Sequence, residues 1–262
     1  MQEFAPPLTF STLVTTLRAA GCVFAEDEAE LLLSTATGPA ELATMLERRV
    51  AGLPLEHVLG WAEFCGLRIA VDPGVFVPRR RTEFLVRQAA ALAPDRAVVV
   101  DLCCGTGALG RALASSLREV ELHAADVEPA AVSCARRNMG GHGTVHEGDL
   151  FEPLPRSLRG RVDVLLANVP YVPTDDVELL PAEARIHEPR IALDGGGDGL
   201  DVMRRVVAEA TDWLAPGGSL LVETSERQAA RAEETVGSSG LVARVVASEE
   251  LYATVVIGTR PR

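Results

Sequence analysis

The sequence predicts an α/β fold in which a doubly wound, mostly parallel β-sheet follows a small helical N-terminal unit. From residue 97 onward, short apolar runs alternate with amphipathic helical patterns, as they do in strand–helix–strand units. Residues 8–52 instead show helical spacing throughout. Hydrophobic residues make up 47% of the 262 residues, which is enough for a sizeable core. We therefore expect a helical domain over residues 1–52, a linker over 53–77 and an α/β domain over 78–262.

The helical unit is expected to contain three helices. Leu13 and Leu17 fall on one helical face, and residues 29–36 form an apolar run with Glu on its flanks. Pro39 opens the third helix, because proline is favoured in a first helical turn. A unit of about 50 residues is small, so we expect it to pack against the rest of the chain. In the linker, alternating residues and three glycines predict a pair of strands.

The α/β domain is expected to alternate strands and helices. The predicted strands span 97–102, 121–126, 162–167, 219–223, 241–247 and 254–259, with one more before Gly148. The predicted helices span 108–117, 129–139, 201–214 and 228–236. This order indicates a sheet whose ligands bind at the carboxyl ends of the strands.

Charge and cysteine usage narrow the class of protein. The formal net charge is −12, and all 25 basic residues are Arg. A nucleic-acid binder usually presents a basic face, so the charge argues weakly against a nucleic-acid substrate. The five cysteines contain no Cys-x-x-Cys pair, and we expect no metal site. Because no signal peptide and no apolar stretch of about 20 residues is present, we expect a soluble, cytoplasmic protein without a membrane contact.

A glycine-rich loop follows the first predicted strand of the α/β domain. Its glycines, at 105, 107 and 110, form a Gly-x-Gly-x-x-Gly pattern that permits a tight turn and close approach to a ligand. The next strand ends in Asp126, where an acid can bind ribose hydroxyls. The pattern alone is weak: it also suits a dinucleotide, or a strand–helix turn that binds nothing.

Two acidic positions favour S-adenosylmethionine over a dinucleotide as the cofactor. Asp101 stands just before the loop, where a carboxylate suits an ammonium or sulfonium group and would repel pyrophosphate. Asp149 follows the next strand, where it is placed to meet the adenine amino group. The candidate cofactor-binding residues are Asp101, Cys103, Cys104, Gly105, Thr106, Gly107, Asp126, Asp149, Leu150 and Asn168.

The tetrapeptide Asn168-Val169-Pro170-Tyr171 follows the strand at 162–167 and is the candidate catalytic site. An amide or exocyclic amine is a poor nucleophile because its lone pair is delocalised. The Asn168 side-chain oxygen and the Val169 carbonyl can accept hydrogen bonds from both of its N–H groups and so direct the nitrogen lone pair at a methyl group. Pro170 keeps Val169 extended, and Tyr171 offers a flat face for a planar group. A simple loop is the alternative, because Asn and Pro are common in turns.

Over nearly its whole length the chain resembles the protein-(glutamine-N5) methyltransferases that modify peptide chain release factors. Residues 54–60 and 63–67 are similar to the family's linker hairpin. Val-Pro-Arg-Arg-Arg-Thr-Glu at 77–83 resembles its Ile-Pro-Arg-Pro-Glu-Thr-Glu segment, and 187–193 resembles its Phe-Glu-Pro stretch. The resemblance implies a Rossmann-like class I methyltransferase domain with a seven-stranded sheet, and a helical N-terminal domain for substrate recognition. It also implies that a Gly-Gly-Gln loop binds between them, its glutamine amide held by Asn168 and the Val169 backbone.

The chain departs from the family pattern at several positions. Val169 replaces the first proline of the usual Asn-Pro-Pro-Tyr, which keeps the carbonyl but loses rigidity. Cys103 and Cys104 replace Gly-Thr and are expected to be small packing residues, and Arg80 and Arg81 replace Pro and Glu. These changes leave open a divergent paralogue with another protein, RNA or small-molecule substrate.

Three rival functions remain at this point. The first is methylation of an exocyclic base amine in RNA or DNA, for which the same tetrapeptide type serves. The second is a nicotinamide-dependent oxidoreductase that uses the glycine loop, and the third is a non-catalytic module that binds a cofactor or partner. The expected partner is a release factor, with nucleic acid the less favoured substrate. The sequence leaves the oligomeric state open.

Overall fold

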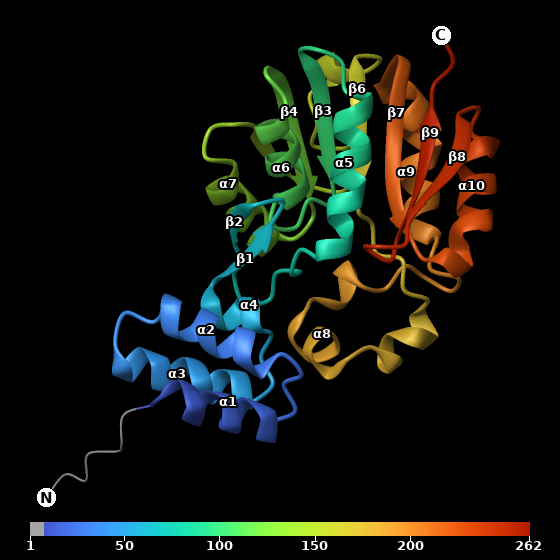
Figure 1. The fold of residues 1–262 in the computed structure, drawn as a ribbon. Coiled ribbons are helices and arrows are strands. Elements are labelled where there is room, and N and C mark those ends of the chain that lie inside the picture. Colours follow the sequence, from blue (N-terminus) through green and yellow to red (C-terminus); the bar gives the residue numbers. More distant parts are fainter. Residues whose placement is uncertain (1–7) are drawn as a thin grey trace, which may run out of the picture.

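The structure, a computed structural model, describes residues 8–262. The first three helices form a bundle that lies beside the sheet domain (Figure 1). They are α1 (Phe10–Ala19), α2 (Ala25–Thr35) and α3 (Pro39–Val50). Leu13, Leu17 and Leu32 are fully buried in a core of their own. The Thr9 side chain caps α1, and Pro39 occupies the first turn of α3 as predicted.

The linker differs in part from the predicted strand pair. It begins with a short helix, α4 (Leu55–Leu59), and continues as the antiparallel hairpin of β1 (Trp61–Phe64) and β2 (Leu67–Ala70). The strand prediction was therefore wrong for residues 55–59. Pro54 precedes this helical turn, and Gly60 ends it with a left-handed φ of 81°, so the residues between them close one turn.

Seven strands form the main sheet, in the order β5-β4-β3-β6-β7-β9-β8. β3 to β7 run parallel, and β9 pairs antiparallel with both β7 and β8. The strands are β3 (Ala97–Leu102), β4 (Val120–Asp126), β5 (Thr144–Glu147), β6 (Val162–Ala167), β7 (Leu214–Thr224), β8 (Val242–Ser248) and β9 (Ala253–Thr259). The predicted mostly parallel, seven-stranded sheet is confirmed. β7 is longer than predicted, because its pairing with β6 begins at Leu214 and resumes, after a register shift, at Ser219.

Helices cover both faces of this sheet (Figure 1). One face packs against α5 (Glu83–Leu92), α6 (Ala108–Ser116) and α7 (Pro129–Met139). The other packs against α9 (Asp201–Trp213) and α10 (Ala229–Ser238). Alternate residues of β3 enter the two cores, Val99 on the first face and Val100 on the second. Both faces of the sheet are thus buried, which is why its strands are continuous apolar runs.

A segment over 173–193 connects β6 to the rest of the domain and lies near the N-terminal helices (Figure 1). It contains the turn η3 (Thr174–Leu179), the short helix α8 (Ala182–His187) and the turn η4 (Arg190–Ala192). Arg49 of α3 donates to Glu183 of α8 over 2.6 Å and is itself paired with buried Glu28. The helical unit therefore contacts the sheet domain through an ion pair. Within residues 8–262, no helix combines the length and apolar character that crossing a membrane requires.

Candidate active site

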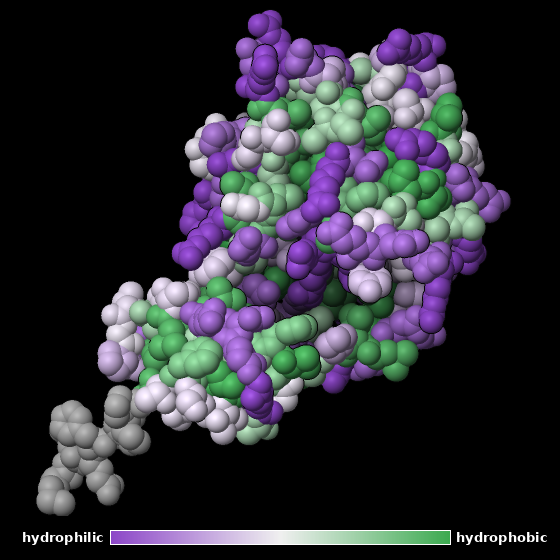
Figure 2. Space-filling view, viewed as in Figure 1, coloured by the Kyte–Doolittle hydropathy of each residue, from purple (hydrophilic) through white to green (hydrophobic). Residues whose placement is uncertain are grey.

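A cavity of about 430 Å³ opens at the carboxyl ends of the parallel strands. Figure 2 shows a hollow where the N-terminal helices meet the sheet domain. Residues 103–106, 126, 149–150 and 168–171 lie at the carboxyl ends of four different strands, and all of them line the cavity. The chain moves outward from β3 to β5 and then returns to β6 on the other side of β3. Such a reversal of strand order separates the loops and leaves room for a ligand.

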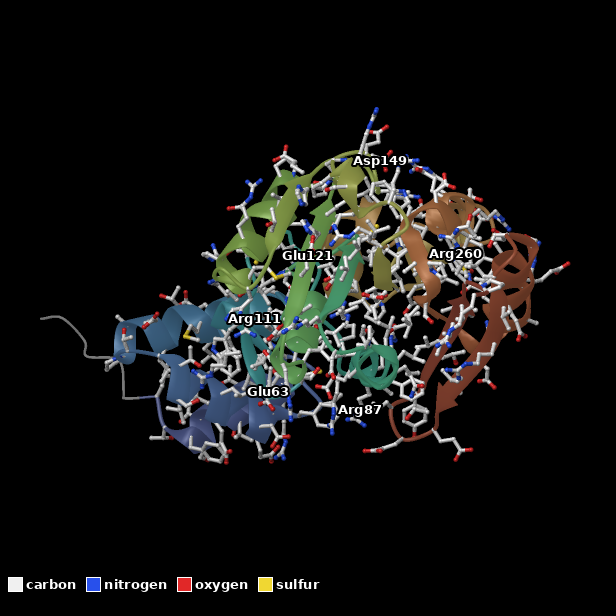
Figure 3. All side chains as sticks on the ribbon, turned by 90° about the horizontal axis from the view of Figure 1, so that it is seen from above. Glu63, Arg87, Arg111, Glu121, Asp149 and Arg260 are labelled. Carbon is white, nitrogen blue, oxygen red and sulfur yellow. The ribbon has the colours of Figure 1, made fainter. Side chains whose placement is uncertain are left out.

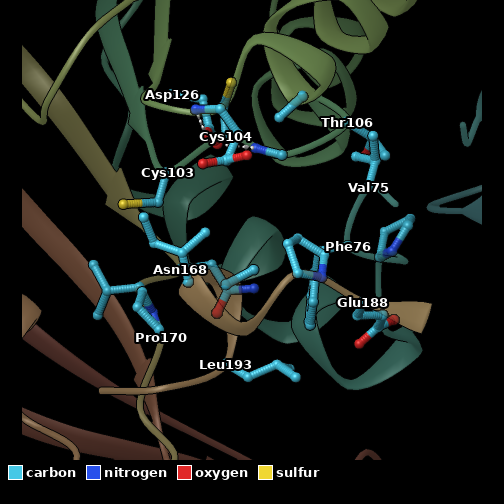
Figure 4. Close-up of a pocket in the computed structure, with 18 of the residues that line it drawn as sticks. Val75, Phe76, Cys103, Cys104, Thr106, Asp126, Asn168, Pro170, Glu188 and Leu193 are labelled. Carbon is cyan, nitrogen blue, oxygen red and sulfur yellow. Dashed lines mark hydrogen bonds between the residues drawn. The ribbon is translucent and has the colours of Figure 1, made fainter. Parts of the chain in front are cut away.

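The glycine loop is tied to the acid at the end of β4. The backbone N–H of Gly105 donates to Oδ2 of Asp126 over 2.8 Å, and the N–H of Glu128 donates to Oδ1 over 3.0 Å. Burial raises the pKa of the Asp126 carboxyl, while these N–H groups oppose that rise. Asp126 and Thr106 are both drawn at the cavity in Figure 4. Asp126 is therefore held rigidly at the cavity, and its contact with the cofactor ribose stays a prediction.

Asp101 and Gly107 do not line the cavity, although both are candidate cofactor residues. Asp101 is 1% exposed and lies behind the loop, where its Oδ2 accepts the Gly110 N–H over 2.9 Å. Its Oδ1 is buried without a hydrogen-bond partner among residues 8–262. Gly107 has a φ of 75°, and a Cβ there would stand 3.1 Å from the Met139 side chain. Its glycine is thus explained by backbone conformation and packing, and the cofactor contacts of both residues stay predictions.

The paired cysteines after β3 lie in the cavity wall, and Cys103 has a left-handed φ of 53°. Burial raises the pKa of both thiols well above the usual range, and Asp126 and Asp101 raise it further. Protonated, unreactive thiols agree with their predicted role as small packing residues. In Figure 4 they lie on the Asp126 side of the cavity.

The third acidic position has a partner that the sequence did not indicate. Asp149 Oδ2 accepts a hydrogen bond from the Arg205 guanidinium over 2.5 Å, and both residues line the cavity. Leu150 beside it is buried with a φ of 48°. Leu150 and Val127 add apolar surface, which suits a flat adenine ring.

The catalytic candidates follow β6 directly. Asn168 lines the cavity, and its Oδ1 is buried with no hydrogen-bond partner among the described residues. Val169 is 2% exposed, and no hydrogen bond between residues 8 and 262 is donated to its carbonyl. Figure 4 shows Asn168 and Pro170 across the cavity from Asp126. An unpaired buried acceptor costs about 1–3 kcal/mol, so the free Asn168 oxygen, beside a Val169 carbonyl that accepts no hydrogen bond, suits a ligand with two N–H donors.

A glycine-rich segment at 195–199 supports this loop from behind. Gly199 has a φ of 78°, and a Cβ there would lie 2.3 Å from the Tyr171 carbonyl oxygen. A Cβ on Gly195 would lie 2.6 Å from the Pro170 oxygen. Gln228 also donates to the Tyr171 carbonyl, over 2.9 Å. The sequence analysis missed this support, although a run of glycines after an acid could have suggested close backbone approach.

Two of the segments that resemble the family pattern, 77–83 and 187–193, meet at the cavity. Arg79 donates to both carboxylate oxygens of Glu188 over 2.6 Å, and the Val77 N–H donates to Oε1 over 3.2 Å. The Glu188 side chain is 1% exposed. Figure 4 places Glu188 and Phe76 together on one side of the cavity. This ion pair joins the segment 75–79 to the segment 173–193 and holds both at the cavity.

Tyr171 is held through its hydroxyl. The hydroxyl donates to Glu223 Oε1 over 3.0 Å and accepts from the Arg81 guanidinium over 2.7 Å. Burial raises the pKa of the Tyr171 phenol, and Glu223 raises it further. Neither partner was singled out for the site. Glu223 could have been, because it is an acid at the end of a predicted strand, as Asp126 is.

The comparisons with known proteins agree with this geometry. The "Methyltransferase small domain" family model matches residues 66–200. A Pyrococcus furiosus methyltransferase structure superposes with a TM-score of 0.57 at 16% identity, covering 75% of this chain and 90% of that chain. A T. thermophilus 16S rRNA methyltransferase, solved with AdoMet and guanosine, gives a TM-score of 0.54 at 20% identity, covering 76% and 49%. The family model identifies a methyltransferase domain, and the solved structures show that its fold is that of the class I, S-adenosylmethionine-dependent methyltransferases.

Sequence relatives identify the particular family. The Geobacter sulfurreducens release factor glutamine methyltransferase is 42% identical over 223 residues, which are 77% of this chain and 78% of the relative. That of Mycolicibacterium smegmatis is 38% identical over 255 residues, 90% of each chain. The chain belongs to the release factor glutamine methyltransferase family. The predicted family, fold, enzyme class and cofactor are thereby confirmed, and the alternative of a nicotinamide-dependent oxidoreductase is excluded.

Proposed function

We propose that this chain methylates the side-chain amide nitrogen of a glutamine in the Gly-Gly-Gln loop of a peptide chain release factor. The observation that carries the proposal is the buried, unpartnered Oδ1 of Asn168 in the wall of the cavity. A primary amide has two N–H donors on one nitrogen, and two neighbouring residues that line the cavity carry acceptors without partners, the Asn168 Oδ1 and the Val169 carbonyl.

The residues of the loop supply orientation more than acid–base chemistry. When bound, S-adenosylmethionine supplies an electrophilic methyl group. By accepting hydrogen bonds from both N–H groups, Asn168 and Val169 twist the amide so that the nitrogen lone pair leaves conjugation and points toward the methyl group. Pro170 restricts Val169 to extended backbone and so sets the direction of its carbonyl. The sulfur keeps the electron pair of the broken S–CH₃ bond, and the methylated nitrogen, now cationic and acidic, releases its proton to water without a strong general base.

Two further observations favour a protein substrate over a nucleic acid. The net charge is −12, and side chains of both signs are spread over the surface, as the labelled acids and arginines of Figure 3 illustrate. The Mycolicibacterium smegmatis relative, whose name states a release factor substrate, is matched over 90% of both chains. The helical residues 1–52 would serve as the substrate-recognition domain, the linker 53–77 would join it, and residues 78–262 would form the catalytic domain. Residues 1–7 of that division lie outside the described structure.

We also propose that the protein works in the cytoplasm, where release factors act. All five cysteines are free thiols in the structure, as is usual in a reducing compartment.

The test uses isotope-labelled S-adenosylmethionine with purified release factor and, separately, with total RNA. We expect label in the release factor, and mass spectrometry should place one added methyl group on the glutamine of Gly-Gly-Gln. Label that enters RNA alone would overturn the proposed substrate. Asn168→Ala should lower kcat by about 10²-fold or more, because it removes one orienting acceptor, while calorimetry finds the cofactor Kd changed only a few-fold. Unchanged turnover would refute the role of Asn168.

A further inference from the structure

Three side chains from distant parts of the sequence form a closed hydrogen-bonded triangle behind the catalytic loop. Arg81 Nε donates to Glu223 Oε1 over 3.1 Å, Arg81 Nη2 donates to the Tyr171 hydroxyl over 2.7 Å, and that hydroxyl donates to Glu223 Oε1 over 3.0 Å. Each member contacts the other two. The Tyr171 hydroxyl is thus fixed from two directions.

Glu223 is the buried member of this triangle. It lies on β7, one residue beyond the last register pair between β6 and β7, Ala167 with Val222, and so stands level with Asn168. Its side chain is 3% exposed, and its Oε2 is buried without a partner among residues 8–262. Arg81 is the one cation that an ion pair assigns to this carboxylate in the described chain. A buried carboxylate needs such a partner, because an unpaired buried charge is strongly unfavourable.

Arg81 reaches the site from the short turn η1 (Arg80–Thr82), which precedes α5. Its side chain is 47% exposed and lines the cavity, as does Tyr171. The pKa of the Arg81 guanidinium is raised by its two partners against the opposing effect of burial, so it keeps its charge. The guanidinium therefore bridges a rigid strand and the aromatic residue that ends the catalytic tetrapeptide.

The catalytic loop, Asn168 to Tyr171, lacks one backbone restraint that the family pattern provides. Val169 stands where the family pattern has a proline, so its φ is not set by a ring. Gln228 holds the Tyr171 backbone through its carbonyl over 2.9 Å, and the triangle holds the far end of the ring. With both ends of Tyr171 fixed, the chain from Asn168 to Tyr171 is restrained without the proline.

We propose that Arg81 is a positioning residue for methyl transfer, which acts by anchoring the Tyr171 hydroxyl to Glu223. The inference rests on the proposed function. Its physical content is that Arg81 fixes the ring that forms the wall beside Asn168, and so fixes the substrate amide relative to the two acceptors. A misplacement of about 1 Å can cost about 10²-fold in rate, so a residue that touches no reacting atom can still control kcat.

The kinetic test compares Arg81→Met, Tyr171→Phe and the double variant with Arg80→Met, the control that removes the neighbouring exposed arginine. We expect Arg81→Met to lower kcat by about 10- to 100-fold with the cofactor Kd within twofold of wild type, and Arg80→Met to change neither. Because Arg81 acts through the Tyr171 hydroxyl, the double variant should be no slower than Tyr171→Phe. Multiplied losses in the double variant, or an unchanged kcat in Arg81→Met, would overturn the proposal.

A second variant distinguishes a loss of kcat caused by lost positioning from one caused by lost stability. Arg81→Met leaves Glu223 buried without its cation, whereas Arg81→Met with Glu223→Gln removes both charges. We expect this pair to unfold at a temperature near that of the wild type and to keep the loss in kcat. Recovery of full kcat in the pair would mean that Arg81 serves stability alone, and would overturn the proposal.

The chain offers a readout that needs no activity, because it contains only two tyrosines. Tyr171 is in the triangle, and Tyr252 is 91% exposed. In protein labelled with ¹³C at the tyrosine ζ carbon, Arg81→Met should move the Tyr171 resonance and leave that of Tyr252 in place. Arg80→Met should move neither, and an unmoved Tyr171 resonance in Arg81→Met would overturn the inference. If the wild type fails to methylate release factor, the proposed substrate falls, while this spectrum still decides whether Arg81 holds Tyr171.

Discussion

Asp101 makes a prediction about stability that follows directly from its burial. Its side chain is 1% exposed, and it is stabilised as a carboxylate by one backbone N–H, that of Gly110. Burial, opposed by that N–H and reinforced by the nearby Asp126, raises its pKa from 3.8 to about 7. The folded chain therefore holds a carboxyl group that resists ionisation. The perturbation is Asp101→Asn, which removes the titration and keeps the shape.

The size and sign of the effect follow from proton linkage. Between pH 3.8 and about 7 the unfolded chain has lost this proton while the folded chain keeps it, so stability falls as pH rises through this range and levels off above it. Each unit of pKa shift is worth about 1.4 kcal/mol. From pH 5 to pH 8 the wild type should therefore lose about 3 kcal/mol relative to Asp101→Asn, which is about 6–12 °C in Tm for a domain of this size.

The assay is thermal unfolding of both proteins, without cofactor, from pH 5 to pH 8. Comparing the change between two pH values cancels any constant cost of fitting an amide at this position. Asp95→Asn is the control, because Asp95 is exposed, and its Tm should follow that of the wild type across the range. The Tm of Asp101→Asn minus that of the wild type should rise with pH, and a difference that stays constant or falls would refute the reasoning.

Two pairs of substitutions, each a test and its control, examine residues that support the cavity. Arg49→Met should lower the free energy of unfolding in urea by about 3–5 kcal/mol, because it leaves buried Glu28 without its partner. Glu183→Gln, which removes the second carboxylate paired with Arg49, should cost less than about 1 kcal/mol since that side chain is 47% exposed; equal costs would contradict this account. Gly199→Ala should lower kcat by about 10²-fold, since its Cβ would displace the Tyr171 carbonyl. Gly197→Ala, with nothing within 4 Å of its Cβ, should leave kcat unchanged, and similar kinetics for the two variants would argue against the close approach.

The sheet and much of the site could be predicted because both follow from regular geometry. Apolar runs such as 97–102 and 162–167 are strands buried on both faces, and a repeated alternation of strands with helices leads to a parallel sheet. Parallel strands bring their carboxyl ends to one edge, so polar residues after those strands had to meet. Asp126, Asp149 and Asn168 do line one cavity. The short helix at 55–59 was missed, since five residues carry too little periodicity to be told from a strand.

Other parts of the site depend on loops whose paths no local pattern specifies. Arg81, Tyr171 and Glu223 are 90 and 52 residues apart in sequence and meet only because η1 and the end of β7 close on the tetrapeptide. The contact of Glu188 with Arg79 joins segments 109 residues apart. Asp101 has the position predicted for it along the chain, but its side chain points behind the glycine loop and away from the cavity wall.

The sequence by itself predicted the fold and the strand ends at which the site lies, because periodicity and motif order are local properties of the chain, and its resemblance to a known family indicated the enzyme class. The tertiary structure decided which side chains face the cavity, which are buried behind it, and which cation neutralises Glu223. Those choices arise from packing between segments far apart in sequence, where the direction of one side chain depends on the space that all the others leave.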